Sequence, residues 1–319
     1  MRYLTELRLC CLAAGPDTMA LTSAARLKRA LRQFVLWPIE ALFGYAIFGL
    51  ARMLPVTIAS GLMGWLFRMI APLTPWQTRA RHNLGHALPD LSVDQQADIL
   101  AKMWDNLGRV IGEYPHIGHL HQDGRVTYVG TEHIANLKTG AFLIGAHIGN
   151  WEVGPLAALS VGKNVAAIYR PLNNPLLARL LTRRQDTYGG DIYRKGREAA
   201  LGMVTSLRKG QMMCLLVDQQ LREGMNVPFF GHPARTSISH IKIAIKKQVP
   251  ILFMRTERVG SARFRVTISP PIDLPKTADD ATILMIATDI NSELERWIRA
   301  APEQWFWPHR RWGKHIKIG

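Results

Sequence analysis

The strongest constraint on the fold is an alternation of short apolar runs with helical stretches, which begins near residue 125. The helical patterns lie near 150–160, 174–188, 196–208, 237–247 and 279–300. The apolar runs are rich in β-branched or aromatic residues and read RVTYVG, AFLIGAH, NVAAIYR, MMCLLVD, PILFMRTE and RFRVTIS. Such alternation is typical of an α/β domain, in which helices flank a mostly parallel central sheet. We therefore predict an α/β core over residues 121–312.

The chain before this core reads as helical and contains one long apolar run. Residues 34–51, FVLWPIEALFGYAIFGLA, follow the basic stretch RLKRALR, which places the preceding end in the cytoplasm if the run inserts. We expect a basic segment over 1–33, a membrane anchor over 34–54 and a helical membrane-proximal part over 55–120. The anchor either spans the bilayer or lies in its interface. The alternative is a buried helix pair of a soluble protein.

The net charge indicates the class of partner, and the cysteine content indicates the compartment. Forty Lys and Arg against 24 Asp and Glu give a net charge of +16, which favours an anionic partner. A hydrophobic fraction of 48% and nine Trp suit membrane lipids better than nucleic acid. The three cysteines, Cys10, Cys11 and Cys214, form neither a disulfide framework nor a C-x-x-C metal motif, which indicates a reducing compartment.

The stretch AFLIGAHIGNWEVG at 141–154 carries the first candidate site. The spacing of His147 and Glu152 is close to chance in a chain with eleven histidines and 24 acids. However, His147 follows a predicted buried strand, and open α/β sheets bind ligands at the carboxyl ends of their strands. On one continuous helix the two side chains would face apart, so they can meet only across a strand-to-helix turn. There Glu152 would orient the imidazole, and Asn150 would cap the next helix. The alternative is a structural histidine beside a solvated glutamate.

Other predicted strands also end in polar residues. Arg170 follows one strand in YRPLNNP, which turns at Asn174, and Arg183 and Arg184 come later. Asp218 follows another strand in VDQQLREG. A site at one edge of the sheet explains these positions, whereas surface charge for the arginines and a helix cap for Asp218 are the alternatives.

The sequence has no activated protein nucleophile. The G-x-S-x-G elbow, Walker A, G-x-G-x-x-G and H-E-x-x-H patterns are all missing. A His–Glu pair without a serine partner therefore favours direct transfer to a substrate hydroxyl over a covalent enzyme intermediate.

Taken together, four blocks resemble the late acyltransferases of lipid A biosynthesis, the lauroyl and myristoyl transferases of the H-x4-D/E lysophospholipid acyltransferase-like group. The blocks are GAHIGNWE, YRPLNNP, VDQQ…G…VPFFG…T and PEQWFWPHRRW, and the resemblance covers about residues 35–312. It implies a glycerol-phosphate acyltransferase-like fold in the cell inner membrane, with the active site on the cytoplasmic side. It also implies transfer of a fatty acyl chain from acyl carrier protein to a hydroxyl of the Kdo-bearing lipid A precursor in lipopolysaccharide biosynthesis. The donor is carried on phosphopantetheine, and neither a metal nor an organic cofactor is expected.

By this resemblance His147 and Glu152 are the catalytic pair. An arginine from 183–184 and Asp218 would line the phosphate and head-group side. The predicted substrate-binding set is Asn150, Arg170, Asn174, Arg183, Arg184, Asp218 and Gln219. Many members have an acid where this chain has Gln220, so that position receives no role.

Two other readings remain open at this point. An acyltransferase for a lysophospholipid, ornithine lipid or other glycolipid would use the same pair on a different acceptor. A basic membrane or nucleic-acid binding protein would bind with steep salt dependence and without turnover. The C-terminal PEQWFWPHRRWGKHIK is either a membrane-interface surface or packing followed by a basic tail over 313–319.

Overall fold

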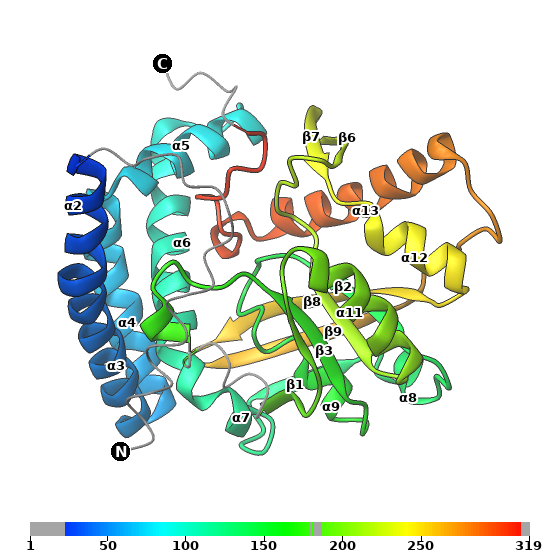
Figure 1. The fold of residues 1–319 in the computed structure, drawn as a ribbon, viewed down its shortest axis with the longest axis horizontal. Coiled ribbons are helices and arrows are strands. Elements are labelled where there is room, and N and C mark those ends of the chain that lie inside the picture. Colours follow the sequence, from blue (N-terminus) through cyan, green and yellow to red (C-terminus); the bar gives the residue numbers. More distant parts are fainter. Residues whose placement is uncertain (1–22, 179, 181–186, 314–319) are drawn as a thin grey trace.

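A seven-stranded sheet forms the centre of the computed structural model, which describes residues 23–178, 180 and 187–313 (Figure 1). The strand order is β1-β9-β8-β2-β5-β3-β4. From β8 to β4 all neighbours are parallel, whereas β9 is antiparallel to β8 and parallel to β1. The strands are β1 Val126–Val129, β2 Ala141–Gly145, β3 Val165–Tyr169, β4 Ile192–Arg194, β5 Met212–Leu216, β8 Ile251–Gly260 and β9 Arg263–Pro271. The predicted α/β fold with a mostly parallel sheet is confirmed.

Both faces of the central strand β2 are buried under helices. Phe142 and Ile144 pack into one core cluster, and Ala141 and Leu143 pack into another, as the two-residue period of a strand requires. The first face is covered by α11 (Arg197–Arg208), α12 (Ser239–Lys247) and α13 (Asp280–Ala300), and the second by α7 (Ile117–Leu120), α8 (Glu132–Ala135) and α9 (Leu156–Leu159). A separate hairpin of β6 (Met225–Phe229) and β7 (His232–Thr236) lies beside α13.

Three of the predicted helical stretches, 196–208, 237–247 and 279–300, correspond to α11, α12 and α13. The stretch 150–160 is helical only from Leu156, because residues 151–155 form turns. Part of 174–188 lies outside the described residues.

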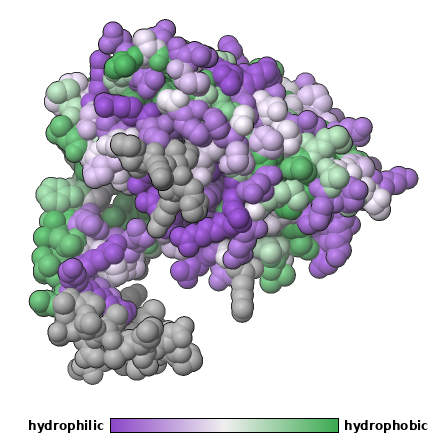
Figure 2. All heavy atoms as spheres, turned by 90° about the horizontal axis from the view of Figure 1, so that it is seen from above, coloured by the Kyte–Doolittle hydropathy of each residue, from purple (hydrophilic) through white to green (hydrophobic). Residues whose placement is uncertain are grey.

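The N-terminal helices expose a large apolar surface. Helix α2 (Ser23–Leu31), a π-helical turn at Arg32–Leu36 and α3 (Trp37–Met53) form one long helix. The π turn lies just before Pro38, whose missing N–H and bulky ring disrupt the regular hydrogen-bond ladder. By length and composition, Leu27–Met53 and Val56–Leu73 can each cross a membrane, and the first is only 11% buried. Figure 2 shows these apolar side chains along its left edge.

This surface indicates membrane association, as expected for the run 34–51. It differs from a buried helix pair of a soluble protein, because Phe34, Leu42 and Phe43 are all more than 60% exposed. A second apolar helix, α4 (Val56–Ile70), lies where only a membrane-proximal part was predicted.

Helix α6 (Val93–Glu113) joins the N-terminal helices to the core. It begins with a capping box, in which Ser92 and Gln95 exchange hydrogen bonds of 2.8 and 3.2 Å. Its packing against α4 is very close. A Cβ added at Gly108 would lie 2.1 Å from the Met63 carbonyl oxygen, and one at Gly112 would lie 2.4 Å from that of Ala59. Glycine is therefore required at both positions.

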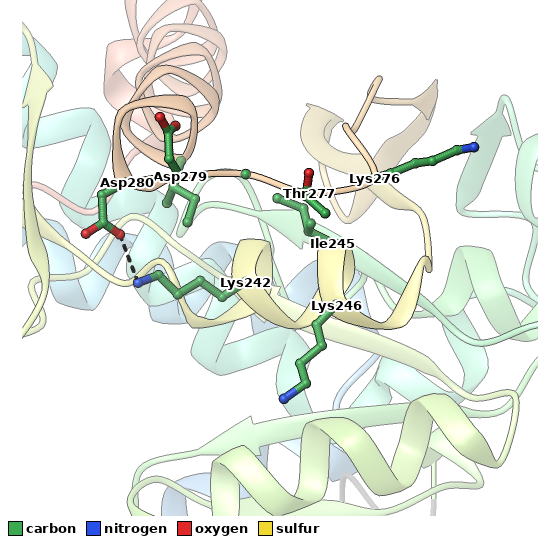
Figure 3. Close-up of a pocket in the computed structure, with 9 residues that line it drawn as sticks. Lys242, Ile245, Lys246, Lys276, Thr277, Asp279 and Asp280 are labelled. Atoms are coloured by element: carbon green, nitrogen blue, oxygen red, sulfur yellow. Dashed lines mark hydrogen bonds and ion pairs between the residues drawn. The ribbon is translucent and has the colours of Figure 1, made fainter.

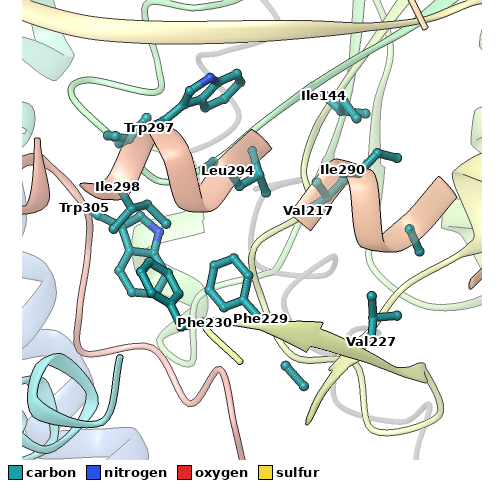
Figure 4. Close-up of a cluster of buried hydrophobic side chains, with 14 of the residues drawn as sticks. Ile144, Val217, Val227, Phe229, Phe230, Ile290, Leu294, Trp297, Ile298 and Trp305 are labelled. Carbon is teal, nitrogen blue, oxygen red and sulfur yellow. The ribbon is translucent and has the colours of Figure 1, made fainter. Parts of the chain in front are cut away.

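The C-terminal segment packs into the core. After α13 and a short 3-10 turn at Pro302–Gln304, the chain passes beside residues 147–149. The ring of Trp305 lies among Phe229, Phe230 and α13 (Figure 4). Trp305, Trp307, Arg311 and Trp312 are all buried, so packing is the correct alternative for this stretch up to residue 312.

Candidate active site

His147 lies at the carboxyl edge of the sheet, as predicted. Strand β2 ends at Gly145, and the neighbouring β5 leads into Asp218. The backbone N–H of Val217 donates to the Gly145 carbonyl oxygen at 3.0 Å, which keeps the two strand ends side by side. Two sequence segments 71 residues apart thus place a histidine and a carboxylate together.

Asp218 holds His147 at two points. Its Oδ1 lies 2.8 Å from His147 Nδ1, and its Oδ2 accepts the His147 backbone N–H at 2.9 Å. Trp305 Nε1 also donates to Oδ2, at 2.8 Å. Burial opposes the ionisation of Asp218, but the charge and hydrogen bonds of His147, together with nearby His309, outweigh it and hold the pKa of this carboxyl well below its usual range.

Asp218 thus holds the imidazole, and a place for it on the phosphate side of the site stays a prediction. Its side chain is fully buried, and both oxygens already accept hydrogen bonds. An ionised carboxylate at this place favours the tautomer of His147 that carries its proton on Nδ1, which leaves Nε2 as an acceptor.

Gln219 lies beside that second ring nitrogen. Its Nε2 is 3.1 Å from His147 Nε2, and both side chains are only partly buried. A side-chain amide there can donate to the imidazole or to a group that displaces it. Gln219 is thus a predicted substrate-binding residue that lies within hydrogen-bond distance of the basic nitrogen of His147.

Glu152 does not take the place predicted for it. The ring nitrogens of His147 meet Asp218 and Gln219, so the expectation that Glu152 orients the imidazole is wrong. Glu152 is buried and accepts hydrogen bonds from Trp151 Nε1 at 3.1 Å and from Tyr188 Oη at 3.3 Å. The Trp151 ring packs against His147, with 5.1 Å between centroids, so Glu152 is linked to the histidine through an indole.

A buried polar network supports the turn that carries these residues. Asn150 donates to Glu113 Oε2 at 2.8 Å and accepts the Glu152 backbone N–H at 3.2 Å. Arg258 forms a two-point ion pair with Glu113, one arm at 2.9 Å, and its Nε donates to Asn106. Asn150 is fully buried in this network, and its contact with substrate stays a prediction. The expectation that it caps the next helix is wrong, because residues 151–155 form turns and α9 begins only at Leu156. Asn150 instead accepts the Glu152 backbone N–H within that turn.

Gly149 allows the turn to pass close to β8. It has a φ of +61°, and a Cβ there would lie 2.5 Å from the Thr256 carbonyl oxygen. A side chain would push His147 and its loop away from the sheet edge. Gly149, two residues after His147, is therefore required for steric reasons.

The other predicted residues lie in different surroundings. Arg170 is exposed after β3, where its charge adds to burial in lowering the pKa of Lys195. Asn174 is buried and donates to the Trp37 carbonyl at 2.8 Å and to Glu40 at 3.1 Å, so it joins its loop to α3. Its role in substrate binding stays a prediction. Arg183 and Arg184 lie outside the described residues.

Two aromatic residues of the C-terminal segment were missed. Trp305 binds Asp218, and the ring of His309 packs edge-on against His147, with 4.5 Å between centroids. Burial, with the charges of His147 and Arg311, lowers the pKa of His309 to about 3, so it is neutral near pH 7. A histidine within the aromatic and cationic block PHRRW was the only signal available for this contact.

His147, Asp218 and His309 each bring one ligand atom within 4.8 Å of the others, and within the described ranges no other group of three His, Cys, Asp or Glu does so. Both Asp218 oxygens already accept N–H groups, and His147 Nδ1 faces one of them. This pattern fits a hydrogen-bonded acid–base pair better than a set of metal ligands.

A pocket elsewhere on the molecule is separate from this site. It is lined by Lys242, Lys246, Lys276 and the first residues of α13 (Figure 3). Helix α13 has 21 residues and so spans about 30 Å. Because the other end of this helix leads into Trp305, the pocket lies about a helix length from His147.

The chain is similar to known proteins over most of its length. The sequence model for bacterial lipid A biosynthesis acyltransferases matches residues 25–314. The lipid A biosynthesis palmitoleoyltransferase of Escherichia coli (strain K12) is 26% identical over 281 residues, covering 84% of this chain and 89% of the relative. The lipid A biosynthesis lauroyltransferase of the same strain is 25% identical over 243 residues, covering 72% and 76%. The lipid A biosynthesis acyltransferase of Haemophilus influenzae is 25% identical over 240 residues, covering 72% and 74%. The chain thus belongs to the bacterial lipid A biosynthesis acyltransferase family.

Proposed function

We propose that the protein transfers a fatty acyl chain from an acyl-carrier-protein thioester to a hydroxyl group of the Kdo-bearing lipid A precursor. The observation that carries this proposal is the contact between His147 and Asp218 at the sheet edge, which leaves Nε2 of the histidine as the basic nitrogen. The charge of +16 supports it, because the carrier protein is acidic and the acceptor is phosphorylated.

In the proposed reaction His147 is the general base. Nε2 takes the proton of the acceptor hydroxyl, whose oxygen forms a bond to the thioester carbonyl carbon. The carbon–sulfur bond then breaks, and the thiolate leaves with the proton that the imidazolium returns. No covalent enzyme intermediate is needed, because the hydroxyl of the acceptor is itself the nucleophile.

The neighbouring groups receive positioning roles. Asp218 fixes the tautomer of His147 and stabilises the imidazolium as it forms. Glu152 holds Trp151 against the imidazole through its hydrogen bond to the indole. The amide of Gln219 lies next to the reacting nitrogen and is placed to contact the acceptor oxygen or the thioester carbonyl.

The apolar helices α3 and α4 support a location at the inner membrane. An active site on its cytoplasmic side fits both the cysteine content and the use of a cytoplasmic carrier protein. The acceptor then enters from the lipid phase, while the donor arrives from water.

The test is a panel of acyl-carrier-protein thioesters with three acceptors: the lipid A precursor, a lysophospholipid and an ornithine lipid. Products are weighed by mass spectrometry. We expect the lipid A precursor alone to gain one acyl chain, whereas transfer only to the lysophospholipid or ornithine lipid would contradict the proposed acceptor.

His147→Ala tests the site within the same assay. It should abolish transfer while the protein stays with the membrane fraction, and His119→Ala, at an exposed position, should keep its activity. Unchanged transfer by the His147 variant would contradict the proposed mechanism.

A further inference from the structure

One face of α5 (Pro75–Ala87) presents basic side chains to the C-terminal segment and the β6–β7 hairpin. Arg79, His82 and His86 follow one another at intervals of three and four residues, which places them on one side of the helix. The ring of His86 stacks on His232 of β7, with 3.7 Å between centroids, and lies 6.4 Å from the ring of His82. Burial and, to a smaller extent, the charge of nearby Arg310 lower the pKa of Arg79. We call these five residues the basic ledge.

The basic ledge has no acidic partner among the described residues. None of its members takes part in an ion pair there. Burial lowers the pKa of His86, and His232 and His82 lower it further. Burial and Arg310 do the same for Arg79. Arg79 and Arg310 are like charges without a counter-charge among the described residues, and a bound anion removes their repulsion.

An unpaired atom also points to a ligand. His82 Nε2 is buried and has no hydrogen-bond partner within the part of the chain that the structure describes, which is costly for a polar nitrogen. The ledge does not have the geometry of a metal site, because its ligand atoms do not converge as those of His147, Asp218 and His309 do. A ligand with several acceptor oxygens suits it better than a cation.

The basic ledge adjoins the catalytic histidine. Between its histidines, Asn83 donates to the carbonyl oxygens of Trp307 at 2.7 Å and His309 at 2.5 Å. Arg79 donates to the carbonyl oxygen of Pro308 at 3.5 Å. His309 in turn packs on His147, so a single backbone segment separates the ledge from the reacting nitrogen.

The ledge also lies near the expected boundary between lipid and water. Helix α5 begins two residues after Leu73, which ends the second apolar stretch, and Trp76 in its first turn is 51% exposed. A lipid with its chains beside α4 would bring its head group to α5.

We propose that the basic ledge binds a phosphate monoester on the sugar head group of the acceptor lipid. This inference rests on the proposed function, because it assigns part of the same substrate. A phosphate monoester carries about −1.5 to −2 charges and three acceptor oxygens. The guanidinium of Arg79 can contact two of those oxygens, and the imidazoles can donate to the third.

Acceptors with and without their phosphates test the ledge, which is probed in the full-length enzyme in detergent micelles. Arg79→Gln should raise KM for the phosphorylated acceptor about tenfold and leave kcat nearly unchanged, because one charge-assisted contact is lost. With an acceptor that lacks the bound phosphate, the variant and the unaltered enzyme should have the same KM. Arg79→Lys should recover part of the loss. Arg81→Gln is the matched control, since Arg81 is exposed and two residues further along α5.

Equal KM increases for both acceptors in Arg79→Gln would overturn the inference. The inference would also be overturned if Arg79→Gln weakened only the binding to phosphatidylglycerol vesicles, because the basic ledge would then bind the bilayer and not the acceptor phosphate. Failure of every acceptor in the unaltered enzyme would instead count against the proposed function. Calorimetry with glucosamine 1-phosphate separates the two cases. We expect glucosamine 1-phosphate to bind the unaltered protein, glucosamine not to bind it, and Arg79→Gln to weaken the binding of glucosamine 1-phosphate about tenfold. If glucosamine 1-phosphate does not bind the unaltered protein, the inference about the basic ledge is overturned.

Discussion

Asp218 accepts two hydrogen bonds from His147, one from the ring Nδ1 at 2.8 Å and one from the backbone N–H at 2.9 Å. The carboxylate thereby fixes both the ring and the main chain of the same residue. A third donor, Trp305 Nε1, holds the carboxylate itself. His147 thus has little freedom to change its tautomer or to turn away from the sheet edge.

Replacing Asp218 with Asn should lower kcat on the order of 10³-fold and change KM little, because the amide favours the wrong tautomer of His147. Trp305→Phe removes only the outer donor and should have a much smaller effect. Steady-state kinetics with the lipid A precursor checks both variants, with Asp123→Asn as an exposed control. A kcat for Asp218→Asn within twofold of the unaltered enzyme would contradict the assigned role.

The ion pair between Glu113 and Arg258 should be critical for stability. Glu113 is fully buried, so Glu113→Met or Arg258→Met leaves an uncompensated charge inside the protein and should cost about 3–5 kcal/mol. The double variant should be closer to the unaltered protein in stability, yet it should lose activity because Asn150 loses its anchor.

Chemical unfolding in micelles measures these differences. The control is the exposed pair of Lys102 and Asp98, whose side chains are both 59% exposed, and Lys102→Met should cost at most about 1 kcal/mol. Equal costs for Lys102→Met and Arg258→Met would disprove the prediction.

Gly108 should not tolerate even a methyl group. In Gly108→Ala the new Cβ would meet the Met63 carbonyl oxygen, so α4 must shift and the protein should lose about 1–3 kcal/mol. Gly61→Ala is the matched control on α4, because nothing lies within 4 Å of a Cβ there and alanine favours a helix. Thermal unfolding compares the two, and a neutral Gly108→Ala would show that the helices can separate freely.

His240 should make the protein sensitive to acid. Burial lowers its pKa to about 4, whereas an unfolded chain has a histidine pKa of about 6.5. Between these values the unfolded state binds more protons, so stability falls as the pH is lowered, by up to about 1.4 kcal/mol per pH unit.

His240→Leu should reduce this loss between pH 6.5 and 4, as measured by unfolding at a series of pH values. His119→Gln, at an exposed position, should keep the slope of the unaltered protein. Identical slopes for all three proteins would exclude His240 as a cause.

Local patterns were enough to predict the sheet and the position of His147. Period-two burial in β2 and the strand end that follows it are properties of a few consecutive residues. The partner of His147 depends instead on which strands are neighbours. Because β5 lies beside β2, Asp218 reaches the imidazole, although Glu152 is far closer in sequence.

Long-range packing explains the other differences between sequence and structure. Asn174 meets α3 across 137 residues, and Trp305 meets Asp218 across 87. No periodicity within either segment specifies its partner. The surroundings of Asn150 could not be predicted from local sequence either. An asparagine after a strand has the same sequence pattern whether it faces a substrate or a buried Glu113.

The order of Trp305 and His309 relative to the apolar helices has a consequence for biosynthesis. Because synthesis runs from the N-terminal side, α3 and α4 leave the ribosome before Trp305, the donor that holds Asp218. A nascent chain can therefore reach the membrane before His147 is fully supported. His147 gains its complete set of contacts only after residue 309 has been made and has packed against its ring.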